Sequence, residues 1–306
     1  MIVYTQPQTL AQDLGIPVST LFRVSFHLDR HYRRVALPKA GGGVRILSVP
    51  DPILKKIQRQ ILRILLFHRP VSRYATAYRP GGGVRVNALP HCGQQMVLRL
   101  DILHFFDSVR YQQIKEVIFP AGIFSEKLRV LLSCLCYCRD GLPQGAPTSP
   151  AISNLLLREF DFAVGDWCDA RGIRYTRYCD DLTFSGSFDP KPVIRMVSDA
   201  LWQEGFVLNP RKTRFFGPGH RQTVTGVVVN ERPRLEASRR RQLRSELYYC
   251  QKYGVADHLA HLGDPRSPHA YLAALLGRLD FALSLSAEPR LTAGRAWVLE
   301  QLRNDL

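Results

Sequence analysis

Apolar residues recur along this chain at two spacings, one typical of helices and one typical of strands. Between Asp51 and His68, leucine and isoleucine return every three or four positions with Lys and Arg between them, which predicts one long amphipathic helix. The same spacing predicts helices over 1–35, 110–138, 151–169 and 192–205. Short strand-like runs lie between these segments, so we expect an α+β fold.

A triple glycine separates two short strand-like runs in Val35–Pro50, which predicts a β-hairpin. Lys39 and Arg45 make the hairpin basic, and such cations either meet an anionic ligand or are solvated. A second triple glycine at 81–83 allows close approach of the backbone to a ligand. The polar residues around it are candidates for phosphate or sugar contacts: Arg79, Arg85, Asn87 and His91.

Two adjacent carboxylates stand between strand-like runs in Tyr175–Phe184. Aspartate is depleted from strands and common in turns, so this segment predicts a β-hairpin with Asp180 and Asp181 at or beside its tip. Another apolar run ends at Asp101. Crowded carboxylates raise one another's pKa or require a cation, and a hard divalent metal takes oxygen ligands. Two Mg²⁺ ions at a three-carboxylate site suit phosphoryl transfer.

The charge of the chain points to a polyanionic partner. Lys and Arg number 42 against 26 Asp and Glu, a net charge of +16, and nucleic acid is a better match than a membrane because no basic amphipathic segment stands alone. Even the apolar stretch 270–287 is broken by Arg278 and Asp280, and the N-terminus lacks the features of a signal peptide, so we expect a cytoplasmic protein. Cys134, Cys136 and Cys138 lack zinc-type spacing and are interpreted as reduced thiols.

Three sequence signatures then follow in a recognisable order. Asp101 is followed by Phe-Phe-Asp-Ser at 105–108, then comes Leu-Pro-Gln-Gly-Ala-Pro-Thr-Ser-Pro at 142–150, and then Tyr-Cys-Asp-Asp at 178–181. In this order and spacing the chain resembles the reverse transcriptases. Asn-Ala-Leu-Pro-His at 87–91 and Val-Thr-Gly at 224–226 resemble elements of the bacterial retron reverse transcriptases. Cys179 departs from the alanine that retron enzymes commonly carry, and both residues are small.

This resemblance implies a right-hand polymerase. Residues 1–100 would form the fingers with N-terminal helices, and 101–229 the palm, an antiparallel sheet plus helices, with a helical insertion of the fingers at about 110–140. Residues 230–306 would form a helical basic thumb. The palm would hold two Mg²⁺ ions through Asp101, Asp180, Asp181 and the backbone carbonyl of Ile102.

The resemblance also assigns residues to the incoming deoxynucleotide. Phe106 would be a steric gate that leaves no room for a 2′-hydroxyl, and Lys212 a general acid toward the leaving pyrophosphate. If 105–106 continue a strand, at least one of the two phenylalanines must belong to the core. The remaining nucleotide contacts would be Lys39, Arg45 and Gln144. RNA or primer would be positioned by Asn87, His91, Thr225, Gly226, Arg239, Arg240 and Arg241.

The function implied is RNA-directed DNA synthesis on a dedicated structured noncoding RNA, primed from the 2′-hydroxyl of a guanosine. The partners would be that RNA, its short single-stranded DNA product, the deoxynucleotides and an effector protein acting with it in anti-phage defence. A group II intron-like or diversity-generating reverse transcriptase is one alternative, although it should lack the 87–91 and 224–226 elements. A non-enzymatic RNA scaffold for an effector is another.

Overall fold

The computed structural model describes residues 4–38, 42–139 and 141–304. The chain divides into two compact units. Unit 1 comprises residues 1–83 and 98–215, and unit 2 comprises 84–97 and 216–306. Each unit has its own hydrophobic core, which for unit 1 surrounds the sheet and its helices and for unit 2 lies among the C-terminal helices.

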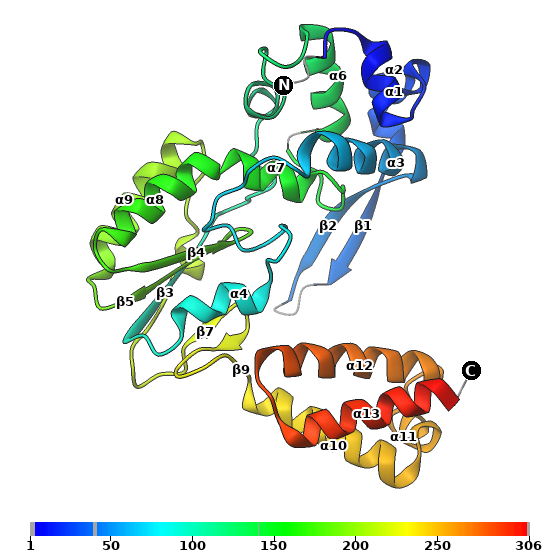
Figure 1. Cartoon of the computed structure of the whole chain (residues 1–306), viewed down its shortest axis with the longest axis vertical. Helices are drawn as coiled ribbons and strands as arrows, with labels where there is room; N and C mark the ends of the chain where they lie inside the picture. The colour runs from blue at the N-terminus through cyan, green and yellow to red at the C-terminus, as the bar shows by residue number, and fades with distance from the viewer. Residues whose placement is uncertain (1–3, 39–41, 140, 305–306) are drawn as a thin grey trace. The chain divides into compact units, whose positions relative to one another are not determined.

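Unit 1 begins with helices α1 (Pro7–Leu14) and α2 (Val18–Phe26) and a 3₁₀ turn at Leu28–His31. The predicted hairpin follows and is confirmed: β1 (Tyr32–Pro38) pairs antiparallel with β2 (Val44–Pro50), with Leu37 opposite Arg45 (Figure 1). Its side chains are largely exposed, since no residue of β1 is buried and Pro50 alone is buried in β2.

The predicted long helix after this hairpin is also confirmed. It consists of α3 (Pro52–Ile61) and a π-helical continuation at Leu62–Leu66. The Asp51 side chain accepts a hydrogen bond from the amide of Leu54 at 2.8 Å, which satisfies an otherwise unpaired amide of the first turn and fixes the start of the helix. Its apolar stripe is buried through Leu54, Ile57 and Ile61.

The remaining helices of unit 1 follow the predicted pattern with two corrections, the first being that the stretch 110–138 is interrupted by the non-helical residues 119–125. The helices are α5 (Tyr111–Gln113) with a π turn at Ile114–Ile118, α6 (Glu126–Cys136), α7 (Ser149–Leu156), α8 (Arg158–Asp169) and, after the second hairpin, α9 (Pro190–Gln203). The single helix expected over 151–169 is two helices that meet at Leu157. Leu157 leaves helical geometry with ψ 12° and is fully buried, and neither glycine nor proline stands at the break.

The main sheet has four strands in the order β4-β5-β3-β6. These are β3 (Met96–Asp101), β4 (Arg174–Tyr178), β5 (Asp181–Gly186) and β6 (Arg214–Phe216). The antiparallel pair β4–β5 is the predicted acidic hairpin, and Tyr175 stacks on Phe184 across it with ring centroids 5.0 Å apart. Helix α8 packs beside β4, and α9 packs beside α8 (Figure 1).

The prediction that a strand continues through Phe105 and Phe106 is wrong. Strand β3 ends at Asp101, and the chain then turns, with His104 at φ 48° and the amide of Ser108 bonded to the carbonyl of His104 at 2.8 Å. Phe105 is nevertheless buried, whereas Phe106 is only partly so. The turn, rather than strand alternation, separates the roles of the two rings.

Unit 2 joins a short segment around residue 90 to the C-terminal part of the chain. The segment holds α4 (Val84–Ala88) and a 3₁₀ turn at Leu89–His91, and it lies beside the three-stranded antiparallel sheet β7 (Thr223–Val224), β8 (Val227–Val228) and β9 (Arg234–Leu235). Four helices follow: α10 (Ala237–Tyr253), α11 (Val255–Leu262), α12 (Pro268–Leu285) and α13 (Pro289–Asn304). In the ranges that the structure describes, none of the helices has the length and apolar character needed to cross a bilayer.

Candidate active site and nucleic-acid contacts

The two hairpins of unit 1 line one cavity of about 870 Å³. Strands β1 and β2 form part of its wall, and the β4–β5 tip, the end of β3 and the turn after β3 form others. It therefore gathers predicted residues that are up to 167 positions apart in the chain (212 − 45). They are Arg45, Asp101, Ile102, Phe106, Gln144, Asp180, Asp181 and Lys212. Lys39 lies outside the described residues.

Asp101 is held at the end of β3 by two partners from the segment after α9. Its carboxylate accepts hydrogen bonds from Lys212 Nζ at 2.7 Å and from Asn209 Nδ2 at 3.2 Å, and its carbonyl accepts the Asn209 amide at 2.7 Å. The hydrogen bond to Asp101 raises the pKa of Lys212, which stays charged. Asn209 was missed in the sequence analysis, although its place three residues before Lys212 was a usable signal.

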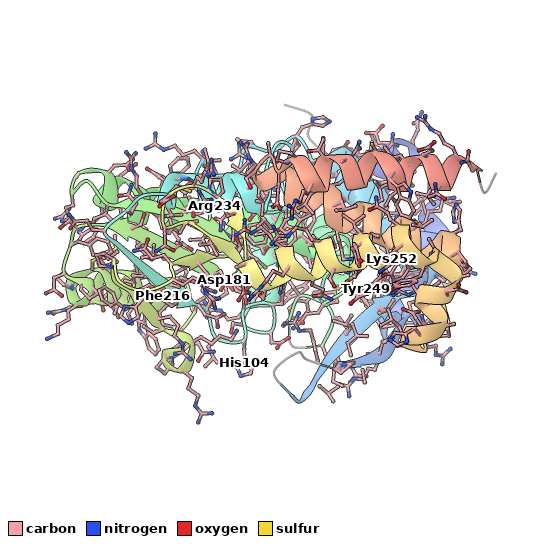
Figure 2. The ribbon with its side chains drawn as sticks, turned by 90° about the horizontal axis from the view of Figure 1, so that it is seen from below. His104, Asp181, Phe216, Arg234, Tyr249 and Lys252 are labelled. Carbon is pink, nitrogen blue, oxygen red and sulfur yellow. The ribbon has the colours of Figure 1, made fainter. Side chains whose placement is uncertain are left out.

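The β4–β5 tip places Asp180 and Asp181 beside Asp101. Cys179 bends the chain with φ 61°, and the amide of Ile102 donates to the carbonyl of Asp180 at 3.1 Å, which ties the tip to the end of β3. Burial, followed by the charge of Asp180, raises the pKa of Asp181 to about 6. Asp181 is labelled in Figure 2. The carboxylates therefore repel one another, as the sequence analysis expected.

These residues fit a divalent cation by charge and by donor type. The three carboxylates and the Ile102 carbonyl are all oxygen donors, which a hard ion prefers, and the raised pKa of Asp181 marks excess negative charge that a cation would relieve. As the side chains stand, no three Asp, Glu, His or Cys residues of the described ranges are arranged to hold an ion. In this arrangement the Lys212 ammonium is the cation nearest Asp101.

A buried ion pair supports the β4–β5 tip, and it was not predicted from the sequence. Arg177 on β4 is fully buried, and its guanidinium donates to Asp161 of α8 at 2.6 and 2.8 Å. The same guanidinium donates to the carbonyl of Cys179 and to Asn154 Oδ1, each at 3.2 Å, and the Tyr175 hydroxyl also donates to Asp161 at 2.9 Å. The usable signal was a charged residue between the strand-forming residues Thr176 and Tyr178.

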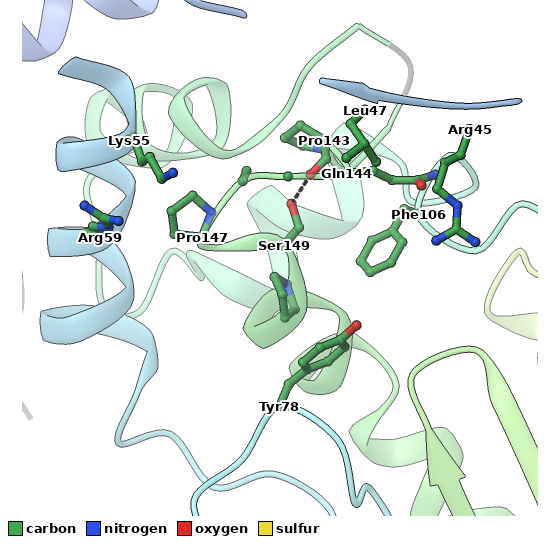
Figure 3. A pocket seen from close by; sticks show the side chains of 13 residues that line it. Arg45, Leu47, Lys55, Arg59, Tyr78, Phe106, Pro143, Gln144, Pro147 and Ser149 are labelled. Atoms are coloured by element: carbon green, nitrogen blue, oxygen red, sulfur yellow. Dashed lines mark hydrogen bonds between the residues drawn. The ribbon is translucent and has the colours of Figure 1, made fainter. Parts of the chain in front are cut away.

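A second, adjacent cavity of about 450 Å³ extends from Gln144 to helix α3 (Figure 3). It shares Arg45, Tyr78 and Phe106 with the first cavity, and Lys55 and Arg59 of α3 reach it from the far wall. Tyr78, Lys55 and Arg59 were not among the predicted site residues. The Tyr78 hydroxyl donates to Cys179 Sγ at 3.3 Å, so this ring is linked to the acidic tip.

The loop that carries Gln144 is rigid for two reasons. The Ser149 hydroxyl donates to the carbonyl of Pro143 at 2.9 Å across the loop (Figure 3). Gly145 has φ 129°, and a Cβ there would come within 3.1 Å of the carbonyl oxygen of Ser48 on β2. Only glycine accommodates both the backbone angle and this approach. The loop thus holds Gln144 against the β1–β2 hairpin.

The predicted RNA-positioning residues around 90 and 225 meet in unit 2. Asn87 Nδ2 donates to Thr225 Oγ1 at 3.3 Å, and the amide of Gly93 donates to the carbonyl of Val229 at 3.0 Å. Thr225 and Gly226 both have positive φ, at 45° and 80°, so they form a tight turn between β7 and β8. Asn87 and His91 are fully buried. Their side chains therefore lie inside unit 2 and not on its surface.

The three predicted thumb arginines differ in their surroundings. Arg239 and Arg241 are exposed, and neither forms an ion pair with any residue in the described parts of the chain. Arg240 is half-buried and lies 3.9 Å from Glu288, which also accepts from Arg244 at 3.3 Å. The first two are therefore exposed to solvent, whereas Arg240 joins α10 to the loop before α13.

Comparison with known proteins gives a consistent result. Residues 37–236 match the family described as reverse transcriptase (RNA-dependent DNA polymerase). The retron Mx65 and Mx162 reverse transcriptases of Myxococcus xanthus are 36% and 33% identical to this chain over 85% and 88% of it, and the chain spans 66% of the length of each. The retron Ec83 reverse transcriptase of Escherichia coli is 30% identical over 69% of this chain and 72% of its own length.

Proposed function

The chain belongs to the reverse transcriptase family, and within it to the retron reverse transcriptases, and from this premise we propose that it copies RNA into DNA by magnesium-dependent phosphoryl transfer. One observation carries the proposal. Asp101, Asp180 and Asp181 line a single cavity together with a cation, an aromatic ring and an amide suited to a nucleotide: Arg45, Phe106 and Gln144.

Each residue has a part in this proposal. Two Mg²⁺ ions, held by the three aspartates and the Ile102 carbonyl, would activate the attacking hydroxyl and stabilise the leaving oxygen. Arg45 binds the triphosphate and Gln144 orients the nucleotide or the template. The Phe106 ring lies flat under the sugar and excludes a 2′-hydroxyl.

Lys212 supplies a proton to the departing pyrophosphate. Its ammonium is 2.7 Å from Asp101, and lysine, with an ordinary pKa near 10.4, is protonated at neutral pH and can act as a general acid. When a nucleotide binds, the lysine has only to turn from the carboxylate to the phosphate. Lys39 is proposed as a further contact to the triphosphate.

The template we propose is a dedicated structured noncoding RNA that also provides the priming 2′-hydroxyl, with a short single-stranded DNA as product. The fingers, palm and thumb would occupy 1–100, 101–229 and 230–306, with the 110–140 insertion belonging to the fingers. Asn87 would act on RNA through the turn at Thr225 and Gly226 that it contacts, and His91 would act from the same buried segment. An effector protein and a role in anti-phage defence complete the proposal.

The test is to purify the full chain from its native locus and sequence the nucleic acid that accompanies it, before and after ribonuclease and a 2′-5′ debranching enzyme. Wild-type protein should carry one short DNA that debranching releases from RNA. Asp180→Asn should carry the RNA without the DNA. Asp107→Asn is the matched control, since Asp107 is an exposed carboxylate of the same cavity, and its DNA should persist.

Other outcomes would change the assignment. DNA made by Asp180→Asn would remove the metal site from the proposal. Heterogeneous RNA without attached DNA, combined with magnesium-dependent synthesis on an added template, would indicate a group II intron-like or diversity-generating enzyme. RNA without any synthesis would indicate a scaffold for an effector.

A further inference from the structure

The C-terminal half of α10 carries an exposed group of tyrosines that the proposed catalytic residues do not include. Tyr248, Tyr249 and Tyr253 expose 53%, 43% and 53% of their surface, in a unit whose other large aromatic residues are mostly covered. Helix α10 buries Leu243, Leu247 and Cys250 on its core side. At 3.6 residues per turn, Tyr248 lies roughly 100–160° around the helix from these three. The rings are therefore not part of the core of unit 2.

The tyrosines form one ordered surface. Tyr249 contacts Tyr248 edge to face with centroids 5.5 Å apart, and it stacks on Tyr253 at 6.2 Å with 19° between the ring planes. Tyr249 also stacks on His258 of α11, with ring centroids 5.9 Å apart and 12° between the ring planes. Because His258 is buried, it fixes the group to the body of unit 2. We call Tyr248, Tyr249 and Tyr253 the tyrosine platform.

Cations accompany this platform along the helix. Lys252 lies over the rings of Tyr248 and Tyr253, 5.4 and 5.0 Å from their centroids, and it is labelled with Tyr249 on α10 in Figure 2. Arg241 lies on the same side of α10, seven residues or about 10 Å before Tyr248. Neither cation forms an ion pair with a described residue. Positive charge and exposed aromatic surface are thus presented together.

This combination is what a single nucleic-acid strand requires. Bases without a pairing partner stack on aromatic rings, while cations along the same line neutralise the phosphates. A protein partner would be recognised through an apolar centre from which charge is depleted, and here lysine sits over the rings. A continuous duplex would hide its base faces and could use the arginines alone. The chemistry therefore favours unpaired nucleotides.

We propose that the tyrosine platform stacks unpaired bases of the RNA partner, and that Arg241 and Lys252 bind the phosphates of the same strand. This deepens the proposed function, on which it rests for the identity of the polyanion as RNA. The two ends of α10 then have different roles. Arginines at its start bind the phosphate backbone of single-stranded or duplex RNA, and tyrosines at its end select a single-stranded segment.

The test compares ring removal with ring retention in the full chain. Binding of a labelled, unstructured 12-nucleotide oligouridylate and of a 12-base-pair RNA duplex is measured across a salt series. The double variant Tyr248→Leu/Tyr253→Leu should bind the single strand about 5- to 150-fold more weakly for each base that loses its ring. Duplex affinity should change less than about twofold. Tyr248→Phe/Tyr253→Phe should bind like the wild type, because phenylalanine also stacks.

Salt dependence separates the rings from the charges. Arg241→Gln should flatten the slope of log affinity against log salt by about 0.7 for the single strand, whereas the leucine variant should keep the wild-type slope. Trp202→Leu is the control for removal of an exposed aromatic, since Trp202 is 70% exposed on α9 in unit 1. This control should bind both RNAs normally. Thermal unfolding of each variant verifies that the fold persists.

Three results would overturn the inference. One is that the leucine variant binds the single strand as tightly as the wild type, which is expected if the platform binds a protein. The others are that the leucine variant loses as much affinity for the duplex as for the single strand, or that the phenylalanine variant binds the single strand as weakly as the leucine variant. Primer extension on a generic primed RNA template, measured in parallel, separates the two proposals. Absence of extension by wild-type protein would refute the proposed polymerase and leave stacking intact. Normal extension with binding independent of tyrosine would refute stacking alone.

Discussion

The two β-hairpins that line the active-site cavity are built in opposite ways. The β4–β5 hairpin is buried along almost its whole length and is anchored to α8 by the Arg177–Asp161 ion pair. The β1–β2 hairpin, within its described residues, buries Pro50 alone. Local opening costs little where few apolar contacts would be lost and much where many would be. One wall of the cavity is therefore fixed, and the other can adjust.

This difference matches the tasks proposed for each hairpin. Metal ligands must keep their geometry through every catalytic cycle, so Asp180 and Asp181 gain from a buried support that fixes the left-handed turn at Cys179. A hairpin that covers an incoming nucleotide must admit it and release pyrophosphate, and substrate-induced closure is common in such elements. Arg45 lies on the hairpin with few buried contacts, where such closure costs least.

Removing the support from the fixed wall should have the largest effect. Arg177→Ala leaves Asp161 as an uncompensated buried charge, so we expect a loss of about 3–5 kcal/mol in the free energy of unfolding, measured by urea titration. The turn at Cys179 would also lose the hydrogen bond to its carbonyl. The magnesium concentration for half-maximal DNA synthesis should therefore rise in the protein that remains folded.

A matched arginine on the same strand provides the control. Arg174 is exposed on β4, three residues before Arg177, and Arg174→Ala should change unfolding by less than about 0.5 kcal/mol. Arg177→Lys retains the charge without the fork of donors, so it should recover part of the stability and less of the magnesium response. If Arg177→Ala unfolds more easily but keeps the wild-type magnesium dependence, the ion pair has a structural role only.

The contrast between the hairpins also explains what could be predicted from the sequence. Strand-like runs on either side of a triple glycine and of an aspartate pair located both hairpins, and the 3.6-residue period located the helix predicted over 51–68. The partner of Arg177 could not be predicted, because Asp161 lies sixteen positions away on a helix and local pattern carries no information about such pairs. The break at Leu157 and the turn at His104 likewise have no glycine or proline to mark them in the sequence.

A smaller effect is expected from a substitution in the β1–β2 hairpin. Arg45→Gln should raise the KM for deoxynucleotides roughly tenfold to a hundredfold, because a hydrogen bond from a charged group to phosphate contributes about 1.5–3 kcal/mol. The free energy of unfolding should stay within about 0.5 kcal/mol of wild type, since Arg45 is exposed. Steady-state kinetics of primer extension gives both KM and kcat.

The neighbouring cation Arg33 tests whether position or charge matters. Arg33 is exposed on β1 and does not line the cavity, so Arg33→Gln removes the same charge from the same hairpin without removing a proposed contact. Its KM should match the wild type. Equal effects from the two variants would mean that the hairpin acts through its general positive field, and the contact assigned to Arg45 would be withdrawn.

The smallest effect concerns protonation of Asp181 on the β4–β5 hairpin. The pKa of Asp181, raised to about 6 by burial and by Asp180, lies above its ordinary value near 4, so between these pH values the folded protein binds a proton that the unfolded chain does not. Without metal, this group stabilises the fold as pH falls through that window and loses the contribution as pH rises through 6. Magnesium requires the carboxylate, so its affinity should fall by about tenfold per pH unit below 6.

Thermal unfolding from pH 7.5 to 4.5, in EDTA and in magnesium, measures both consequences of this shifted pKa. Asp181→Asn should lack the rise in stability at low pH seen in EDTA, whereas Asp107→Asn should keep it, because the Asp107 carboxylate is exposed to solvent. A wild-type difference that persists in Asp181→Asn would assign the proton to another carboxylate. The acidic tip would then be fixed by Arg177 without the charge crowding that calls for a metal.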